Sequence, residues 1–307
     1  MGQQRSDLLF VLILIVLGMG LPHEQVVAKE TDRVDLIRAY LLDANKGGCL
    51  VVAHRGHHKD WPENSVRSIE AAAEAGIHMV ELDVRQTADG EYVLMHDKTV
   101  DRTTNGKGEL AKMTYAALRR LQLKHAERPT GLVIPRYAEA LAAARGKVMI
   151  NVDLKSGSLR DVVEIARKMG VLDHCLFKAN YKDVADEEMT WLQAQEGVVF
   201  MPIVYSLDEA QEAAGDGQFK AIEVVVKGST RGGFTEGVIR RFQAKGVRVW
   251  INTLWNGRLF AGMGDEQAVR KPSKVYSKLA HDGVGMIQTD LPELAIKTMR
   301  EDGVLVP

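Results

Sequence analysis

Four short motifs between positions 54 and 97 hold the side chains of this chain that are best suited to chemistry. They are His54-Arg55-Gly56, Pro62-Glu63-Asn64, Glu81-Leu82-Asp83 and His96-Asp97. Carboxylates hold hard divalent cations, an arginine binds phosphate oxygens, and histidines transfer protons near neutral pH. Together these residue types indicate metal-assisted attack on a phosphate ester.

Eight short apolar runs predict the strands that position these motifs. Helical stretches separate the runs, including those at 64–75, 159–169, 236–244 and 292–299. Runs rich in Val and Ile that alternate with helices are typical of a parallel sheet covered by helices. Eight such units predict an α/β fold, the (β/α)8 or TIM barrel. The predicted strands are 49–54, 79–84, 148–154, 175–178, 198–205, 221–226, 247–252 and 286–289.

A ninth apolar run, at 91–96, has no helix before it. It follows the strand at 79–84 through Ala88-Asp89-Gly90, and Asp-Gly between two such runs indicates a hairpin turn. We therefore expect an extra antiparallel strand. A turn centred between Asp89 and Gly90 pairs His96 with Asp83, which brings the second histidine to the carboxylates. The polar residues 98–135 then form an insertion, expected to be a small subdomain over the barrel mouth.

The working residues of such a barrel lie at the C-terminal ends of its strands. Glu81 and Asp83 are two residues apart on one strand, so their side chains share a face. The next barrel strand repeats this spacing with Asp153 and Lys155. Buried carboxylates need partners, and a metal is one economical partner; a plain Asp153–Lys155 ion pair is the alternative. Later strands add Glu223, Trp250, Asn252 and Asp290.

The four motifs, followed by Asp101-Arg102-Thr103-Thr104, resemble those of the glycerophosphodiester phosphodiesterases in order, spacing and strand placement. The resemblance is strongest over 49–110 and looser through Asp153-Leu154-Lys155 and Gln288-Thr289-Asp290. It implies a phosphoric diester hydrolase with one Mg²⁺ or Ca²⁺ as its cofactor. The implied metal ligands are Glu81, Asp83 and Asp153.

The resemblance also implies the other roles. His54 and His96 would be the proton-transfer pair, Arg55 and Lys155 would neutralise phosphate oxygens, and Glu63 would orient the arginine or a histidine. From the residues themselves, Glu63 is alternatively a helix-start residue. Asp97 is expected to orient His96 or fix its loop. Trp250 is either a packing residue or, because it lies at a strand end, a residue that faces the mouth.

Two departures from the family pattern bear on these roles. The family usually has Glu where this chain has Asp153, one methylene shorter, so the ion would shift, a water would fill the gap, or the site would be weaker. The residues from Trp250 to Gly257 are less typical near the substrate pocket. The second departure bears on which alcohol is released, not on the phosphodiester chemistry.

The expected reaction is hydrolysis of small glycerophosphodiesters to glycerol 3-phosphate and an alcohol. The attacking group is either water or a neighbouring hydroxyl of the substrate, and the sequence leaves open which histidine is the acid. One alternative is a phospholipase-D-like enzyme acting on lysolipid or sphingomyelin. Another is a binding barrel without catalysis, which conflicts with so complete a set of polar residues.

Residues 1–28 resemble a secretory signal, with Arg5 before an unbroken apolar run from Leu8 to Leu17 and small residues before a cut after Ala28. We therefore expect a periplasmic or secreted protein whose residues 29–307 form a single barrel domain without stable membrane insertion. An uncleaved membrane anchor is the alternative, although the run is shorter than the roughly 20 residues that span a bilayer.

Charge and cysteine content set two further limits. The chain has 40 basic and 41 acidic residues, and removing Arg5, Asp7 and Glu24 with the leader leaves equal numbers. A nucleic-acid partner would favour a basic surplus, so none is expected. Cys49 and Cys175 both begin apolar runs and lack metal-binding spacing, so we expect buried free thiols. The sequence leaves the oligomeric state open.

Overall fold

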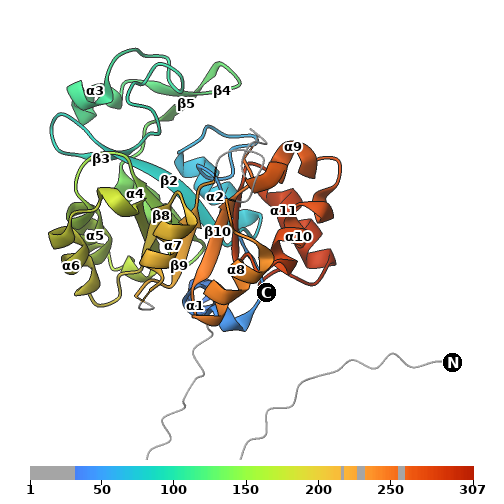
Figure 1. Cartoon of the computed structure of the whole chain (residues 1–307). Helices are drawn as coiled ribbons and strands as arrows, with labels where there is room; N and C mark the ends of the chain where they lie inside the picture. Colours follow the sequence, from blue (N-terminus) through green and yellow to red (C-terminus); the bar gives the residue numbers. More distant parts are fainter. Residues whose placement is uncertain (1–31, 216–217, 227–231, 255–259) are drawn as a thin grey trace, which may run out of the picture. The chain divides into compact units, whose positions relative to one another are not determined.

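The computed structural model describes residues 32–215, 218–226, 232–254 and 260–307, and it contains a closed barrel of eight parallel strands (Figure 1). The strands pair in the order β1-β11-β10-β9-β8-β7-β6-β2, and β1 pairs with β2 to close the ring. The predicted barrel is confirmed, and the predicted leader lies outside the described residues. The strands are β1 (Leu50–Ala53), β2 (Met79–Gln86), β6 (Met149–Leu154), β7 (Cys175–Asn180), β8 (Phe200–Val204), β9 (Ala221–Val224), β10 (Arg248–Asn252) and β11 (Met286–Thr289).

Helices cover the outside of the barrel, and one further helix precedes β1 and packs against the strand starts (Figure 1). Among the residues that the structure describes, none of these helices is long and apolar enough to cross a bilayer. Both cysteines are buried and free, as predicted. The helices are α1 (Arg33–Leu42), α2 (Val66–Glu74), α4 (Tyr137–Ala144), α5 (Leu159–Lys168), α6 (Asp186–Gln193), α7 (Leu207–Ala213), α8 (Glu236–Ala244), α9 (Asp265–Ala268), α10 (Tyr276–His281) and α11 (Pro292–Glu301).

The ninth strand, β3 (Tyr92–Leu94), pairs antiparallel with β2 outside the ring, as predicted. Its predicted register is wrong by one residue, because Met95 and not His96 lies opposite Asp83; the Met95 N–H donates to the Asp83 carbonyl at 2.9 Å. The turn is a three-residue loop centred on Asp89, with Gly90 at φ +83°. A left-handed third loop residue is typical of such hairpins.

Residues 98–135 continue from β3 and carry α3 (Tyr115–Leu118), β4 (Gln122–His125) and β5 (Arg128–Val133), drawn together at the top of Figure 1. This lobe has its own apolar cluster, which includes Val100, Leu110, Leu118, Leu123 and Ile134. This small core explains how residues 98–135 form an ordered lobe although most of their surface is polar.

The barrel interior changes from apolar to polar along the strands. Alternate residues of each strand point inward. Near the strand starts these residues, such as Met79, Met149 and Trp250, pack into one buried cluster with α1. Two positions further on, the same faces carry polar residues, which are all nearly inaccessible. They are Glu81, Asn151, Lys178, Glu223, Asn252 and Gln288.

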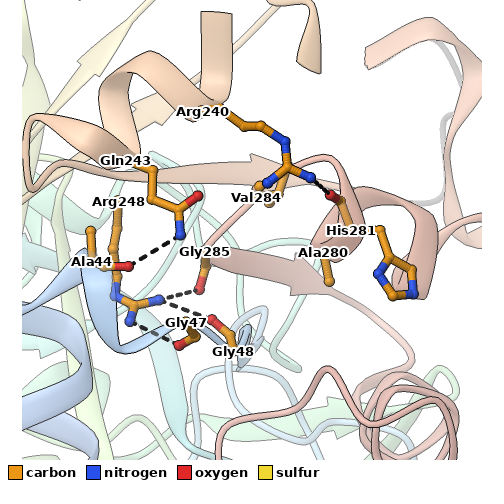
Figure 2. Close-up of a pocket in the computed structure, with 11 residues that line it drawn as sticks. Ala44, Gly47, Gly48, Arg240, Gln243, Arg248, Ala280, His281, Val284 and Gly285 are labelled. Carbon is orange, nitrogen blue, oxygen red and sulfur yellow. Dashed lines mark hydrogen bonds between the residues drawn. The ribbon is translucent and has the colours of Figure 1, made fainter. Parts of the chain in front are cut away.

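The N-terminal end of the barrel is tied together by Arg248, the first residue of β10. Figure 2 shows its guanidinium in a pocket beside Gly47, Gly48 and Gly285, where it donates to all three carbonyls. It also donates to the carbonyls of Tyr40 and Asp43. The guanidinium of Arg248 is bound by backbone carbonyls, so this pocket has a structural role. The residues suited to chemistry lie at the opposite, C-terminal end of the barrel.

His78 makes a second internal link at the N-terminal end. Its Nδ1 accepts from the Val51 N–H at 3.0 Å, and its Nε2 lies 3.2 Å from the Val306 carbonyl. Nε2 must therefore carry the proton, and the ring is neutral. Burial lowers the pKa of His78 to about 4. A depressed histidine pKa stabilises the fold above the unfolded value near 6.5, and this contribution disappears as the pH falls towards 4.

We expect His78→Gln to lower the free energy of unfolding at pH 7.5 by removing the neutral ring. The difference from the wild type should shrink between pH 6.5 and pH 4, by about 3 kcal/mol at most. Urea unfolding of both proteins at several pH values measures this difference. A difference that stays constant over the whole range would contradict the role assigned to His78.

Candidate active site

Three carboxylates meet at the C-terminal end of the barrel. Glu81 and Asp83 come from alternate positions of β2, and Asp153 of β6 lies directly beside Asp83 in the sheet register. One oxygen from each residue lies within 4.8 Å of the others, and all three side chains are mostly buried. Burial and the neighbouring Asp83 raise the pKa of Glu81 above its ordinary value. Buried oxygen donors this close together fit a hard divalent cation.

Positively charged side chains surround this acidic cluster. Lys155 Nζ lies 2.9 Å from Asp153 Oδ2 and 3.3 Å from Asp83 Oδ1. Burial acts to lower the pKa of Lys155, but Asp153, Asp83 and Glu81 raise it above its usual value. Its side chain is 25% exposed, so it remains within reach of an incoming anion.

A second lysine, Lys178 at the inward face of β7, was not assigned a role from the sequence. Its Nζ lies 2.9 Å from Glu223 Oε2 and 3.2 Å from Asp153 Oδ2, and the side chain is 2% exposed. The available signal was a lysine at an inward position near the end of an apolar strand. Such a charge is rarely buried unless it is paired.

His54 follows β1 and is held by Asp290, which follows β11. Its Nδ1 lies 2.8 Å from Asp290 Oδ1, so Nδ1 carries the shared proton and the lone pair of the neutral ring lies on Nε2. Asp290 is fixed in turn by Asp265, a fully buried carboxylate that accepts from the Asp290 N–H. Burial lowers the pKa of His54, although Asp290 opposes the shift.

His96 repeats this arrangement with a different carboxylate. Its Nδ1 lies 2.7 Å from Asp97 Oδ1, which again directs Nε2 away from the carboxylate. Arg102 from the lobe donates to both Asp97 and Glu63. Its hydrogen bond lowers the pKa of Asp97 well below the ordinary value. The lobe therefore fixes the carboxylate that orients His96.

The backbone after β1 takes an unusual shape that places Arg55 over the carboxylates. Arg55 and Asn64 both have φ +54° and Gly56 has φ +81°. The Arg55 N–H donates to Glu81 Oε2 at 3.0 Å, and its guanidinium contacts Glu63 at 2.9 Å. A side chain at Gly56 would collide with Ser68, so the turn requires glycine. Glu63 thus lies against the arginine, one of the two partners predicted for it.

Asn64 links this loop to the acidic cluster and corrects the predicted helix start. Its Nδ2 donates to Asp83 Oδ2 at 2.7 Å, and its Oδ1 accepts from the Asp83 N–H at 3.0 Å. The cap of α2 is Ser65, whose Oγ accepts from the Ser68 N–H. Asn64 is therefore a buried clamp on Asp83, and α2 begins two residues after the predicted start.

Trp250 does not face the mouth, so that prediction is wrong. Its side chain is wholly buried in the barrel interior, where it packs with the apolar cluster over α1. Only the indole N–H points towards the polar half, donating to Asn252 Oδ1 at 2.8 Å. A strand residue two positions before the end is too deep to line the mouth. Residues 255–257, the end of the stretch that is less typical near the substrate pocket, lie outside the described residues.

Comparison with known proteins gives a consistent family assignment. The model of the glycerophosphoryl diester phosphodiesterase family matches residues 54–256. A glycerophosphodiester phosphodiesterase of Caldanaerobacter subterraneus is 40% identical over 111 residues, which are 35% of this chain and 46% of that protein. Glycerophosphodiester phosphodiesterase 1 of Bos taurus is 53% identical over 70 residues, 23% of this chain and 21% of its own. The matches thus span less than half the length of these curated relatives.

Solved structures share the fold over most of the chain. A glycerophosphodiester phosphodiesterase of Agrobacterium tumefaciens is 25% identical with a TM-score of 0.61, covering 80% of this chain and 99% of its own. A glycerophosphoryl diester phosphodiesterase of Parabacteroides distasonis is 24% identical with a TM-score of 0.72, and the match covers 90% of this chain and 93% of its own. A phosphodiesterase of Oleispira antarctica, solved with its product sn-glycerol-3-phosphate, is 22% identical with a TM-score of 0.63. The match covers 84% of this chain and 99% of its own.

We expect Asn64→Ala to destabilise the protein by about 3 kcal/mol, because it breaks two buried hydrogen bonds, one of them to a carboxylate. Asn45→Ala, at an exposed position, is the matched control and should change the stability by less than about 0.5 kcal/mol. Urea unfolding measures both. A loss below about 1 kcal/mol for Asn64→Ala would contradict the clamp.

Proposed function

Because this chain belongs to the glycerophosphoryl diester phosphodiesterase family, we propose that it hydrolyses glycerophosphodiesters to glycerol 3-phosphate and an alcohol. One observation carries the proposal: the acidic cluster and two carboxylate-bound histidines meet at one end of one barrel. The Oleispira antarctica neighbour supports the product, since it was solved with sn-glycerol-3-phosphate. The relatives named above favour this substrate class over the phospholipase-D-like alternative.

We propose one divalent cation, Mg²⁺ or Ca²⁺, as the cofactor. Glu81, Asp83 and Asp153 would hold it, and their buried oxygens are the donor set that these ions take. When bound, the ion would supply positive charge that stabilises the negatively charged phosphoryl oxygens of the transition state. Although the side chain of Asp153 is one methylene shorter than Glu, one of its oxygens still lies within 4.8 Å of an oxygen of Glu81 and of Asp83.

The chain's own cations contribute the remaining phosphate binding. Lys155 is partly exposed beside the cluster and can turn from Asp153 towards a phosphodiester. Arg55 is held over the cluster by Glu63, so its guanidinium is positioned before a substrate arrives. Positive charge fixed in advance stabilises the transition state without a reorganisation cost.

The two histidines would divide the proton transfers. Burial lowers the pKa of His54, so its Nε2 is unprotonated at neutral pH and can accept the proton of the attacking hydroxyl. His96 would then donate a proton to the leaving alcohol from its own Nε2. In both rings the carboxylate at Nδ1 fixes the orientation of the imidazole, as in other carboxylate–histidine pairs.

We also propose that residues 1–28 direct export, so that the barrel acts outside the cytoplasm on small soluble diesters. The support is the basic start, the short apolar run and the small residues before Ala28. Mass spectrometry of the protein from its native host would test this: an N-terminus at Lys29 agrees, and an intact Met1 or Gly2 disagrees.

Metal removal gives the first activity test. Treatment with EDTA should reduce hydrolysis of glycerophosphocholine and glycerophosphoinositol by about 100-fold or more, because the acidic cluster then lacks its cation. Adding Mg²⁺ or Ca²⁺ in excess should restore the activity. Full activity after complete chelation, verified by elemental analysis, would overturn the metal proposal.

Substitution of the two histidines gives the second activity test. His54→Gln and His96→Gln should each lower kcat by about 10² to 10⁴, the usual contribution of a general acid or base. His281→Gln, an exposed histidine at the N-terminal end of the barrel, is the control and should retain full activity. Retention of wild-type kcat by either site variant would remove that histidine from the mechanism.

A further inference from the structure

Lys178 stands apart from the other cations of the site because a substrate cannot reach it. Its side chain is 2% exposed, whereas that of Lys155 is 25% exposed. Its Nζ lies among three carboxylates, 2.9 Å from Glu223, 3.2 Å from Asp153 and 4.0 Å from Glu81. A charge in that position acts on the carboxylates around it and not on the phosphate.

Lys178 is anchored by residues of β9 and β10, which lie on the opposite side of β7 from the ligand strands β6 and β2. Glu223 of β9 accepts from Lys178 through Oε2 and from Asn252 Nδ2, at 2.7 Å, through Oε1. Asn252 accepts in turn from the Trp250 indole N–H, and Lys178 Nζ lies 5.3 Å from the Trp250 ring centroid. This buried chain from β10 through β9 to β7 fixes the ammonium independently of the metal ligands.

The contact with Asp153 is directional. Both Lys155 and Lys178 are nearest to Oδ2 of this carboxylate. Neither ammonium lies nearest to Oδ1, so the two contacts hold the carboxylate in one rotation and leave its Oδ1 side clear of both lysines.

We infer that Lys178 is a positioning residue for the cation site: the Trp250–Asn252–Glu223 chain holds it against Asp153 Oδ2, so that Oδ1 is presented to a divalent cation. The inference rests on the proposed function, which places a cation at the acidic cluster. Lys155 is free to leave Asp153 for a phosphodiester, and Lys178 keeps the short carboxylate in place when it does. Groups that orient a metal ligand commonly change metal affinity by about 10- to 100-fold.

A double variant separates this role from simple charge balance. Lys178→Met with Glu223→Gln removes a buried ion pair of zero net charge, so the formal charge of the site is unchanged while Asp153 loses its anchor. The glutamine amide oxygen can still accept from Asn252. The matched control is Lys182→Met with Glu212→Gln, an exposed lysine–glutamate pair that begins just after β7.

Calorimetric titration of the metal-stripped proteins with Mn²⁺ gives the readout, and thermal unfolding without metal reports on the fold. We expect the wild type to bind one Mn²⁺, the double variant to bind it at least about 10-fold more weakly, and the control to stay within about twofold. A double variant that binds Mn²⁺ as tightly as the wild type, or more tightly, overturns the inference. A wild type that binds no Mn²⁺ overturns the proposed cofactor itself, which is a distinct result.

Trp250→Phe decides the question if the double variant does not fold. It keeps an aromatic ring beside Lys178 and removes only the N–H that holds Asn252. A fold close to wild type with at least about threefold weaker Mn²⁺ binding supports the inference. Unchanged Mn²⁺ affinity in this variant overturns it.

Discussion

The balance of charge inside the C-terminal half of the barrel is the constraint around which this site is organised. Glu81, Asp83, Asp153 and Glu223 are mostly or wholly buried within one strand ring. Ionised carboxylates in such a place are costly unless cations lie next to them. Lys178 provides buried positive charge, and Lys155 provides positive charge that is partly exposed. The divalent cation proposed above would reduce the repulsion that remains between these carboxylates.

The rest of the fold supplies the rigidity that this arrangement requires. The lower half of the barrel is apolar and packed against α1, and Arg248 ties the segment before β1 to the strand starts. Because the N-terminal half is packed in this way, the C-terminal half of the barrel interior can hold polar side chains while the strands stay paired. Outside the ring, Asp265 fixes Asp290, and Arg102 of the lobe fixes Asp97. Each histidine is therefore held by a carboxylate that has its own support.

Much of this architecture could be predicted from the sequence because its signals are local. The apolar runs mark all eight barrel strands, and the two-residue spacings of Glu81–Asp83 and Asp153–Lys155 place each pair on one face. The family inferred from the motifs is the family whose model matches the chain. The hairpin was predicted too, but its register depends on loop geometry, and a three-residue loop moved it by one position.

Contacts between distant strands were beyond the reach of sequence reasoning. The anchoring of Lys178 by Glu223 joins positions 45 residues apart, and the local sequence around Asn64 does not specify that its side chain binds Asp83. Trp250 was misplaced because depth along a strand decides whether a side chain meets the mouth or the core. These contacts and depths are set only when the strands close into the barrel.

The account depends most on a cation at the acidic cluster, and anomalous diffraction from crystals grown with Mn²⁺ tests this most directly. The account predicts one strong anomalous peak bounded by carboxylate oxygens of Glu81, Asp83 and Asp153, with Lys178 still on Asp153 Oδ2. An anomalous map without a peak among these three residues, at a Mn²⁺ concentration that supports full activity, would contradict it.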